Sequence, residues 1–224
     1  MMRPPVKKVA EMNPDPLQGD LFGDDGPEVL GLDGADVVIH RNHFDATEST
    51  TFFEHLQDEI PWNQEETLLF GKRVAIPRLT AWFGDQHGNY SYSGIEMTPH
   101  PWTTLLAEIR DRVDEIAETK FNSVLLNLYR DGNDSVDWHA DDEPELGPTP
   151  IIGSVSFGAT RRFNLRPRDR SLPTVSVDLN HGDVLVMSGP MQRSWQHQIP
   201  KTQRSVGPRV NLTFRTVTLQ NAGP

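Results

Sequence analysis

The chain contains no cysteine among its 224 residues. Disulfide frameworks, thiolate metal sites and cysteine nucleophiles are therefore excluded, and any metal must be held by histidine, carboxylate or carbonyl oxygen. Long apolar runs are also missing. No stretch of about 20 apolar residues could span a bilayer, and the N-terminus lacks the apolar block of a secretory signal. We therefore expect a soluble, intracellular protein, in the cytoplasm or nucleoid if its source is bacterial.

Basic residues are in the minority. The sequence has 21 Lys and Arg against 32 Asp and Glu, which gives a net charge of -11. This charge argues against a protein that coats nucleic acid nonspecifically, although it leaves room for a local basic patch. With 36% hydrophobic residues, the chain can bury one substantial core, so we expect one catalytic domain and a monomer.

Residues 1–35 are rich in Pro, Gly and Asp and show no sustained periodicity. They predict a disordered tail, followed by a globular domain over residues 36–224. Within the tail, QGDLF resembles the Gln-x-x-Leu-Phe peptides with which bacterial repair and replication proteins bind the sliding clamp. Gln18 would hydrogen-bond at the rim of an apolar pocket that takes Leu21 and Phe22. Packing of this dipeptide on its own domain is at least as good an interpretation.

The domain itself combines two helical patterns with many short alternating runs. Residues 46–62 predict a capped amphipathic helix that ends at Pro61, and residues 101–119 predict a second helix. After Lys120 the alternating runs are separated by turn residues, which predicts an antiparallel sandwich or barrel whose outside the helices cover. We expect LTAWFGD, residues 79–85, to form the edge of a substrate lid, although a buried strand would have the same pattern.

Strand alternation separates polar from apolar side chains in two of these runs. In NLY, Asn127 and Tyr129 point together. In RVNLTFR, one face carries only polar residues: Arg209, Asn211, Thr213 and Arg215. The simplest explanation is that each polar face meets water. Two arginines six residues apart would also suit a small dianion bound at both ends, because guanidinium binds carboxylate through a bidentate fork.

SVDWHADDEP, residues 135–144, places four carboxylates around one imidazole. His139 and Asp141 are separated by one residue, so at a strand end both side chains project to the same side. His197 would complete a facial triad of two histidines and one carboxylate, which holds ferrous iron and leaves positions open for substrate and oxygen. An isolated His-x-Asp triplet is often only a solvated pair. The order NLY, HAD, QH and RVNLTFR along one chain favours the metal site.

Together with PRLTAWFGD, YSYSG and PIIGSVSFGATRRF, these motifs resemble the AlkB family of iron- and 2-oxoglutarate-dependent dioxygenases. The resemblance covers about Pro77 to Val217, and it is closest to the subgroup that repairs N-alkylated nucleic acids. It implies a double-stranded β-helix (jelly-roll) core with flanking helices. It also implies the site residues: iron ligands His139, Asp141 and His197; Arg209, Asn211 and Tyr129 at the distal carboxylate of 2-oxoglutarate; Asn127 and Arg215 near its metal-chelating end.

The family implies oxidative demethylation of 1-methyladenine and 3-methylcytosine in DNA or RNA. The reaction would use Fe(II), 2-oxoglutarate and O2, and it would release formaldehyde, succinate and CO2. Because these lesions carry a positive charge, carboxylates near the base would favour them over undamaged bases. Asp142 and Glu143 are the candidates, although either could instead bind arginine or face water.

The damaged base must leave the helix and stack on an aromatic side chain. The resemblance places Tyr92 on one side of the base, His139 on the other and Arg78 nearby, with Tyr90 and Trp82 as second choices. RRFNLRPRDR could supply phosphate contacts, unless it is only a solvated hairpin. Its arginines are Arg161, Arg162, Arg166, Arg168 and Arg170.

Two other classes of function are compatible with the residues. An oxygenase of the same fold could act on a protein side chain or a small metabolite, and the basic segment and Tyr92 would then have no role with nucleic acid. An inactive sandwich could also bind nucleic acid without catalysis. The complete set of metal-binding candidates argues against the second class.

Overall fold

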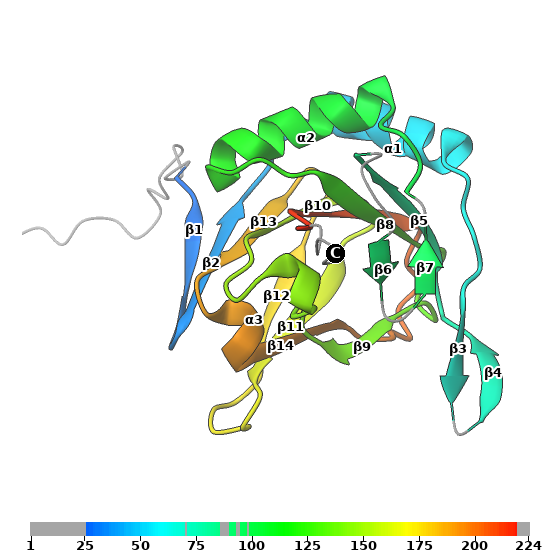
Figure 1. Ribbon diagram of the computed structural model, residues 1–224. Coiled ribbons are helices and arrows are strands. Elements are labelled where there is room, and N and C mark those ends of the chain that lie inside the picture. Colours follow the sequence, from blue (N-terminus) through cyan, green and yellow to red (C-terminus); the bar gives the residue numbers. More distant parts are fainter. Residues whose placement is uncertain (1–25, 70, 86–89, 93–94, 98, 219–224) are drawn as a thin grey trace, which may run out of the picture.

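The computed structural model describes residues 26–69, 71–85, 90–92, 95–97 and 99–218, and at positions 69, 90–92 and 95–97 only the backbone. Two antiparallel sheets form its body (Figure 1). The larger sheet has the strand order β1-β2-β13-β10-β15-β8-β5. Its strands are β1 (Glu28–Leu32), β2 (Ala35–His40), β5 (Leu79–Gly84), β8 (Ser123–Tyr129), β10 (Ile152–Gly158), β13 (Val184–Ser188) and β15 (Arg209–Arg215).

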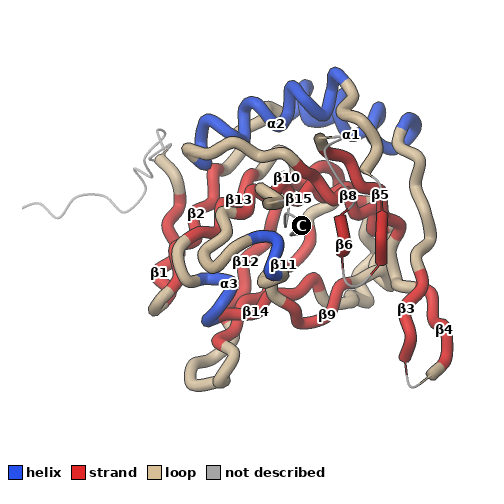
Figure 2. Tube along the Cα trace, viewed as in Figure 1, coloured by secondary structure: helices blue, strands red, loops and turns tan. Residues whose placement is uncertain are grey.

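The smaller sheet has the order β12-β11-β14-β9, and two separate hairpins complete the strands. The β3–β4 hairpin projects from the body (Figure 2). The mostly β, two-sheet arrangement confirms the predicted fold class. The remaining strands are β9 (Val136–His139), β11 (Arg161–Pro167), β12 (Val175–Leu179), β14 (Trp195–Ile199), β3 (Glu66–Leu69), β4 (Lys72–Ala75), β6 (Tyr90–Tyr92) and β7 (Ile95–Met97).

Helices α1 (Ala46–Glu59) and α2 (Thr104–Ala117) cover the outer face of the larger sheet (Figure 1). Asp45 caps α1 by accepting hydrogen bonds from two main-chain N–H groups, and Pro61 disfavours helical backbone at the residue before it. Both predicted helices are confirmed. A four-residue helix, α3 (Met191–Ser194), leads directly into β14. None of the described helices is long and apolar enough to cross a membrane.

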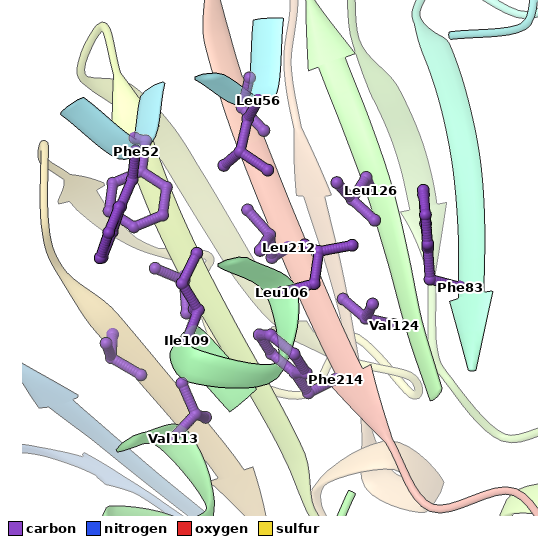
Figure 3. Packing of buried hydrophobic residues seen from close by; sticks show 14 of the residues in the cluster. Phe52, Leu56, Phe83, Leu106, Ile109, Val113, Val124, Leu126, Leu212 and Phe214 are labelled. Atoms are coloured by element: carbon purple, nitrogen blue, oxygen red, sulfur yellow. The ribbon is translucent and has the colours of Figure 1, made fainter. Parts of the chain in front are cut away.

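The main apolar core lies between these helices and the larger sheet. Figure 3 shows α2 residues packed against the apolar sides of β8 and β15. The residues labelled in that view are Phe52, Leu56, Phe83, Leu106, Ile109, Val113, Val124, Leu126, Leu212 and Phe214. Because β15 turns Leu212 and Phe214 towards the helices, its polar side faces the space between the two sheets. All seven residues of β15 are buried, so the explanation that its polar side meets water is wrong.

The predicted boundary at residue 35 is also wrong, because β1 pairs with β2 along its whole length. Asp33 and Gly34 form the two-residue connection, with Gly34 in the left-handed region at φ 66°. An Asp-Gly pair is a strong sequence signal for such a hairpin. The predicted clamp peptide, residues 18–22, lies outside the described residues.

The lid expectation for LTAWFGD is corrected as well. The segment forms β5, which pairs with β8 at one edge of the larger sheet. Five of the six residues in β5 are buried. Because its side chains are buried, the segment is a structural strand and not the edge of a lid.

A close backbone approach occurs at Gly182, between β12 and β13. Gly182 has φ 83°, and a Cβ there would lie 2.2 Å from the carbonyl oxygen of Phe44. We expect Gly182→Ala to lower the free energy of unfolding by about 2 kcal/mol or more, because left-handed strain and a backbone clash combine. Urea unfolding measures this loss.

Two control substitutions separate strain from clash. Gly34→Ala introduces a left-handed alanine with no atom within 4 Å, and it should cost about 1 kcal/mol. Gly207→Ala, in open space and without a positive φ, should change stability by less than about 0.5 kcal/mol. An equal cost for Gly182→Ala and Gly34→Ala would show that the contact with Phe44 does not matter.

Candidate active site

A cavity of about 420 Å³ lies between the two sheets. Its lining comes mainly from β8, β9, β14 and β15, so strands distant in sequence bring their polar sides to one place. Arg78, which precedes β5, also lines it. The structure brings together every residue predicted for iron and 2-oxoglutarate: Asn127, Tyr129, His139, Asp141, His197, Arg209, Asn211 and Arg215.

Three of these residues converge as a candidate metal centre. His139 and His197 are direct neighbours across β9 and β14, and their ring centroids are 4.3 Å apart. Asp141 follows two residues after the end of β9, and its Oδ2 lies 3.9 Å from His197 Nε2. One candidate ligand atom from each of the three residues lies within 4.8 Å of the others. The arrangement fits a facial metal site.

The protonation states of the candidate ligands also fit a metal. Burial alone would raise the pKa of Asp141, but Arg215, which donates to Oδ1 at 2.7 Å, and the two imidazoles lower it to about 2. Burial, and to a smaller extent the electrostatic effect of His139, lower the pKa of His197 to about 3. A carboxylate and a neutral imidazole are therefore present at neutral pH, as metal ligation requires.

Two local hydrogen-bonding features support the same assignment. Asp141 Oδ2 is buried and has no hydrogen-bond partner in the described part of the chain. His139 Nδ1 lies 2.8 Å from the carbonyl oxygen of Asp137. This contact suits an imidazole that donates Nδ1–H to the main chain and offers Nε2 to a metal. An ion such as Fe(II) would satisfy both ligands.

Arg209 supplies a buried positive charge in the same cavity. Its side chain donates to Ser156 Oγ at 2.8 Å, while its Nε and Nη1 have no hydrogen-bond partner among the described residues. Burial lowers the pKa of Arg209 to about 10, so the guanidinium remains charged at neutral pH. The ring of Tyr129 lies 5.3 Å from it. Two unused donors on a buried cation suit the carboxylate of a small anion.

The predicted base-contacting residues have different positions. Arg78 lines the cavity and donates to Asn127 Oδ1 at 2.7 Å. Glu143 also lines it, with a buried Oε2 that has no partner in the part of the chain described. Burial raises the pKa of Glu143. Tyr92 lies in β6, but its side chain is outside the described atoms, so its predicted role stays a prediction.

Asp142 does not line the cavity, and its predicted contact with the base stays a prediction. Its carboxylate instead pairs with Arg168 at 2.5 Å. Successive side chains of an extended segment point to opposite sides. Since the neighbours Asp141 and Glu143 face the cavity, Asp142 faces away.

Strand alternation also divides the arginines of β11. Arg161 is buried and donates to three main-chain carbonyl groups, so its predicted contact with phosphate is wrong. Arg162 is exposed and pairs with Asp178 at 3.2 Å. The guanidinium of Arg166 lies 4.0 Å from the ring centroid of Trp138, a cavity-lining residue.

A jelly roll that encloses two histidines, a carboxylate and a buried arginine is typical of the class of iron- and 2-oxoglutarate-dependent oxygenases. The family model for the 2OG-Fe(II) oxygenase superfamily matches residues 36–215. The chain belongs to this superfamily and, within it, to the AlkB family. The predicted family is confirmed, and the superfamily is named for the iron(II) and 2-oxoglutarate that the sequence predicts as cofactors.

Two relatives and one solved structure are similar to this chain. Human alpha-ketoglutarate-dependent dioxygenase alkB homolog 3 is 44% identical over 190 residues, covering 81% of this chain and 66% of the relative, just under two thirds. Human DNA oxidative demethylase ALKBH2 is 38% identical over 199 residues, covering 84% and 75%. The solved structure of OsALKBH1 has a TM-score of 0.59 at 18% identity, covering 80% and 97%, which supports the fold alone.

Proposed function

We propose that this protein removes methyl groups from ring nitrogens of alkylated bases in nucleic acids. The substrates are 1-methyladenine and 3-methylcytosine in DNA, with RNA as a further substrate. The observation that carries the proposal is a complete candidate site in a chain 38% identical to a relative named DNA oxidative demethylase. An oxygenase acting on a protein side chain or metabolite is the alternative.

One group of cavity residues would bind the iron, and a second group would bind 2-oxoglutarate. His139, Asp141 and His197 would hold the iron. Arg209, with Tyr129 and Asn211, would bind the distal carboxylate of 2-oxoglutarate, while Asn127 and Arg215 lie near its metal-chelating end. When bound, iron(II) with 2-oxoglutarate and O2 supplies oxidation of the N-methyl group, which leaves as formaldehyde while 2-oxoglutarate becomes succinate and CO2.

Glu143 would select the damaged base. Its buried Oε2, which has no partner among the described residues, lies in the cavity wall two residues from Asp141. A carboxylate in this position attracts the cationic rings of 1-methyladenine and 3-methylcytosine more strongly than neutral bases. Tyr92 and His139 would stack on the flipped base, with Arg78 beside it.

Phosphate contacts would come from the outer side of β11. Arg162 and Arg166 share that side of the strand, and Arg166 lies over Trp138 in the cavity wall. Guanidinium groups there would hold the backbone on either side of a flipped nucleotide. Arg168 is committed to Asp142 and contributes less.

We also propose that Gln18, Leu21 and Phe22 bind a sliding clamp. The support is the sequence QGDLF alone. A short peptide that places two apolar side chains into a pocket could bring a monomeric, intracellular repair enzyme to replicating DNA.

A panel of methylated oligonucleotides tests the function. Single-stranded DNA, duplex DNA and RNA carrying 1-methyladenine or 3-methylcytosine are incubated with iron and 2-oxoglutarate supplied or withheld. We expect equal amounts of formaldehyde and repaired base only when both are supplied. Asp141→Ala should retain less than a tenth of the activity, because it removes the carboxylate ligand. Succinate release without repair of any oligonucleotide would favour the alternative substrates.

Substitution of Arg209 tests the binding of 2-oxoglutarate. We expect Arg209→Ala to raise the KM for 2-oxoglutarate at least tenfold, because the bidentate guanidinium contact is lost. Steady-state kinetics with saturating oligonucleotide measure the change. Arg110→Ala, on the outer helix α2, is the matched control and should leave this KM unchanged. An unchanged KM for Arg209→Ala would remove the assignment.

Substitution in the N-terminal peptide tests the clamp proposal. We expect Phe22→Ala to weaken binding of the full chain to a bacterial sliding clamp at least tenfold in a calorimetric titration, because no aromatic side chain then fills the pocket of the clamp. Leu17→Ala, just outside the motif, is the control. Equal affinity of the Phe22→Ala and wild-type proteins would contradict the proposal.

A further inference from the structure

The carboxylate of the candidate metal centre lies beyond the sheet that positions both histidines. His139 and His197 are fixed by the pairing of β9 with β14. Asp141 comes after the last residue of β9 and has no ladder partner there. Arg215 holds one oxygen of its side chain, but the main chain of Asp141 requires another anchor if Oδ2 is to stay beside the imidazoles.

Gln192 supplies that anchor. Its side chain is completely buried on α3, and its Oε1 accepts a hydrogen bond from the main-chain N–H of Asp141 at 3.0 Å. Among the residues that the structure describes, its Nε2 has only a weak sulfur acceptor, Met187 Sδ, at 3.7 Å. Burying an amide with one poor partner is unfavourable compared with an apolar side chain of similar size. Packing alone therefore does not account for a glutamine here.

Arg168 adds a second link between the same two segments. Its Nη2 lies 2.5 Å from Asp142 Oδ2 and 3.0 Å from the main-chain oxygen of Gln192. One guanidinium thus joins the residue after the carboxylate ligand to α3. Because α3 continues directly into β14, both links tie the Asp141 segment to the strand that carries His197.

We propose that Gln192 is a positioning residue for the iron centre, supported by the Arg168–Asp142 pair. It holds the main chain of Asp141 at a fixed place relative to His197, so that the three ligand atoms are arranged before the metal binds. This inference rests on the proposed iron site. Groups that orient metal ligands in this way typically contribute 10- to 100-fold to metal affinity.

Gln192→Met tests the proposal, because it keeps a similar volume and removes the acceptor. Manganese(II) affinity of the metal-free, full-length protein is measured by calorimetry, and its melting temperature is measured in parallel. We expect at least tenfold weaker manganese binding, with the melting temperature of the metal-free protein within about 4 °C of wild type. Gln198→Met makes the same chemical change one residue after His197, on the other side of β14, and should change affinity less than twofold.

A folded Gln192→Met protein that binds manganese within threefold of wild type overturns the proposal. If this variant does not fold, Arg168→Met and Asp142→Asn decide. Each substitution should lower the affinity for manganese at least threefold. The double variant should bind manganese as tightly as the single variant with the lower affinity, because the two side chains act as one link. Unchanged affinity in both single variants overturns the proposal.

The metal titration also distinguishes this inference from the proposed function. If the oligonucleotides are not demethylated but manganese affinity follows the expected order, the positioning role is supported and only the substrate is wrong. If the wild-type protein binds no manganese, the metal centre and the positioning role are both overturned.

Discussion

The pairing of Asp141 with Arg215 inside the cavity is the interaction on which the site depends. Both side chains are buried, and an isolated charge there would cost several kcal/mol. The 2.7 Å contact offsets that cost through Oδ1 and leaves Oδ2 for another cation. Arg209 carries the opposite charge, and two of its buried donors have no partner within the described part of the chain. A dication bound to Asp141 Oδ2 and a carboxylate bound to Arg209 would each neutralise a buried charge.

The two sides of β15 explain how a small domain keeps these charges away from water. Leu212 and Phe214 pack under the helices, while Arg209 and Arg215 face the space between the sheets. The apolar core on one side of the strand stabilises the fold. That stability allows the other side to hold groups whose burial is unfavourable.

Local alternation made much of the site predictable from the sequence. The period of β15 places Arg209 with Asn211, and the His-x-Asp spacing places two ligands together. The side of Asp142 was not predictable, because it depends on where an irregular loop leaves β9. The contact of Gln192 with Asp141 could not be predicted from a local pattern, because the two residues are 51 positions apart. Arg161 belongs to the same basic run as Arg162, but its position in β11 directs it inward.

A crystal structure of the protein loaded with manganese(II), with anomalous diffraction recorded near the manganese absorption edge, would show whether the three side chains bind one ion. We expect one strong anomalous peak within ligand distance of both imidazoles and Asp141 Oδ2, with Oδ1 still bonded to Arg215. A manganese peak elsewhere, or ligands that remain apart when the ion is present, would contradict this expectation.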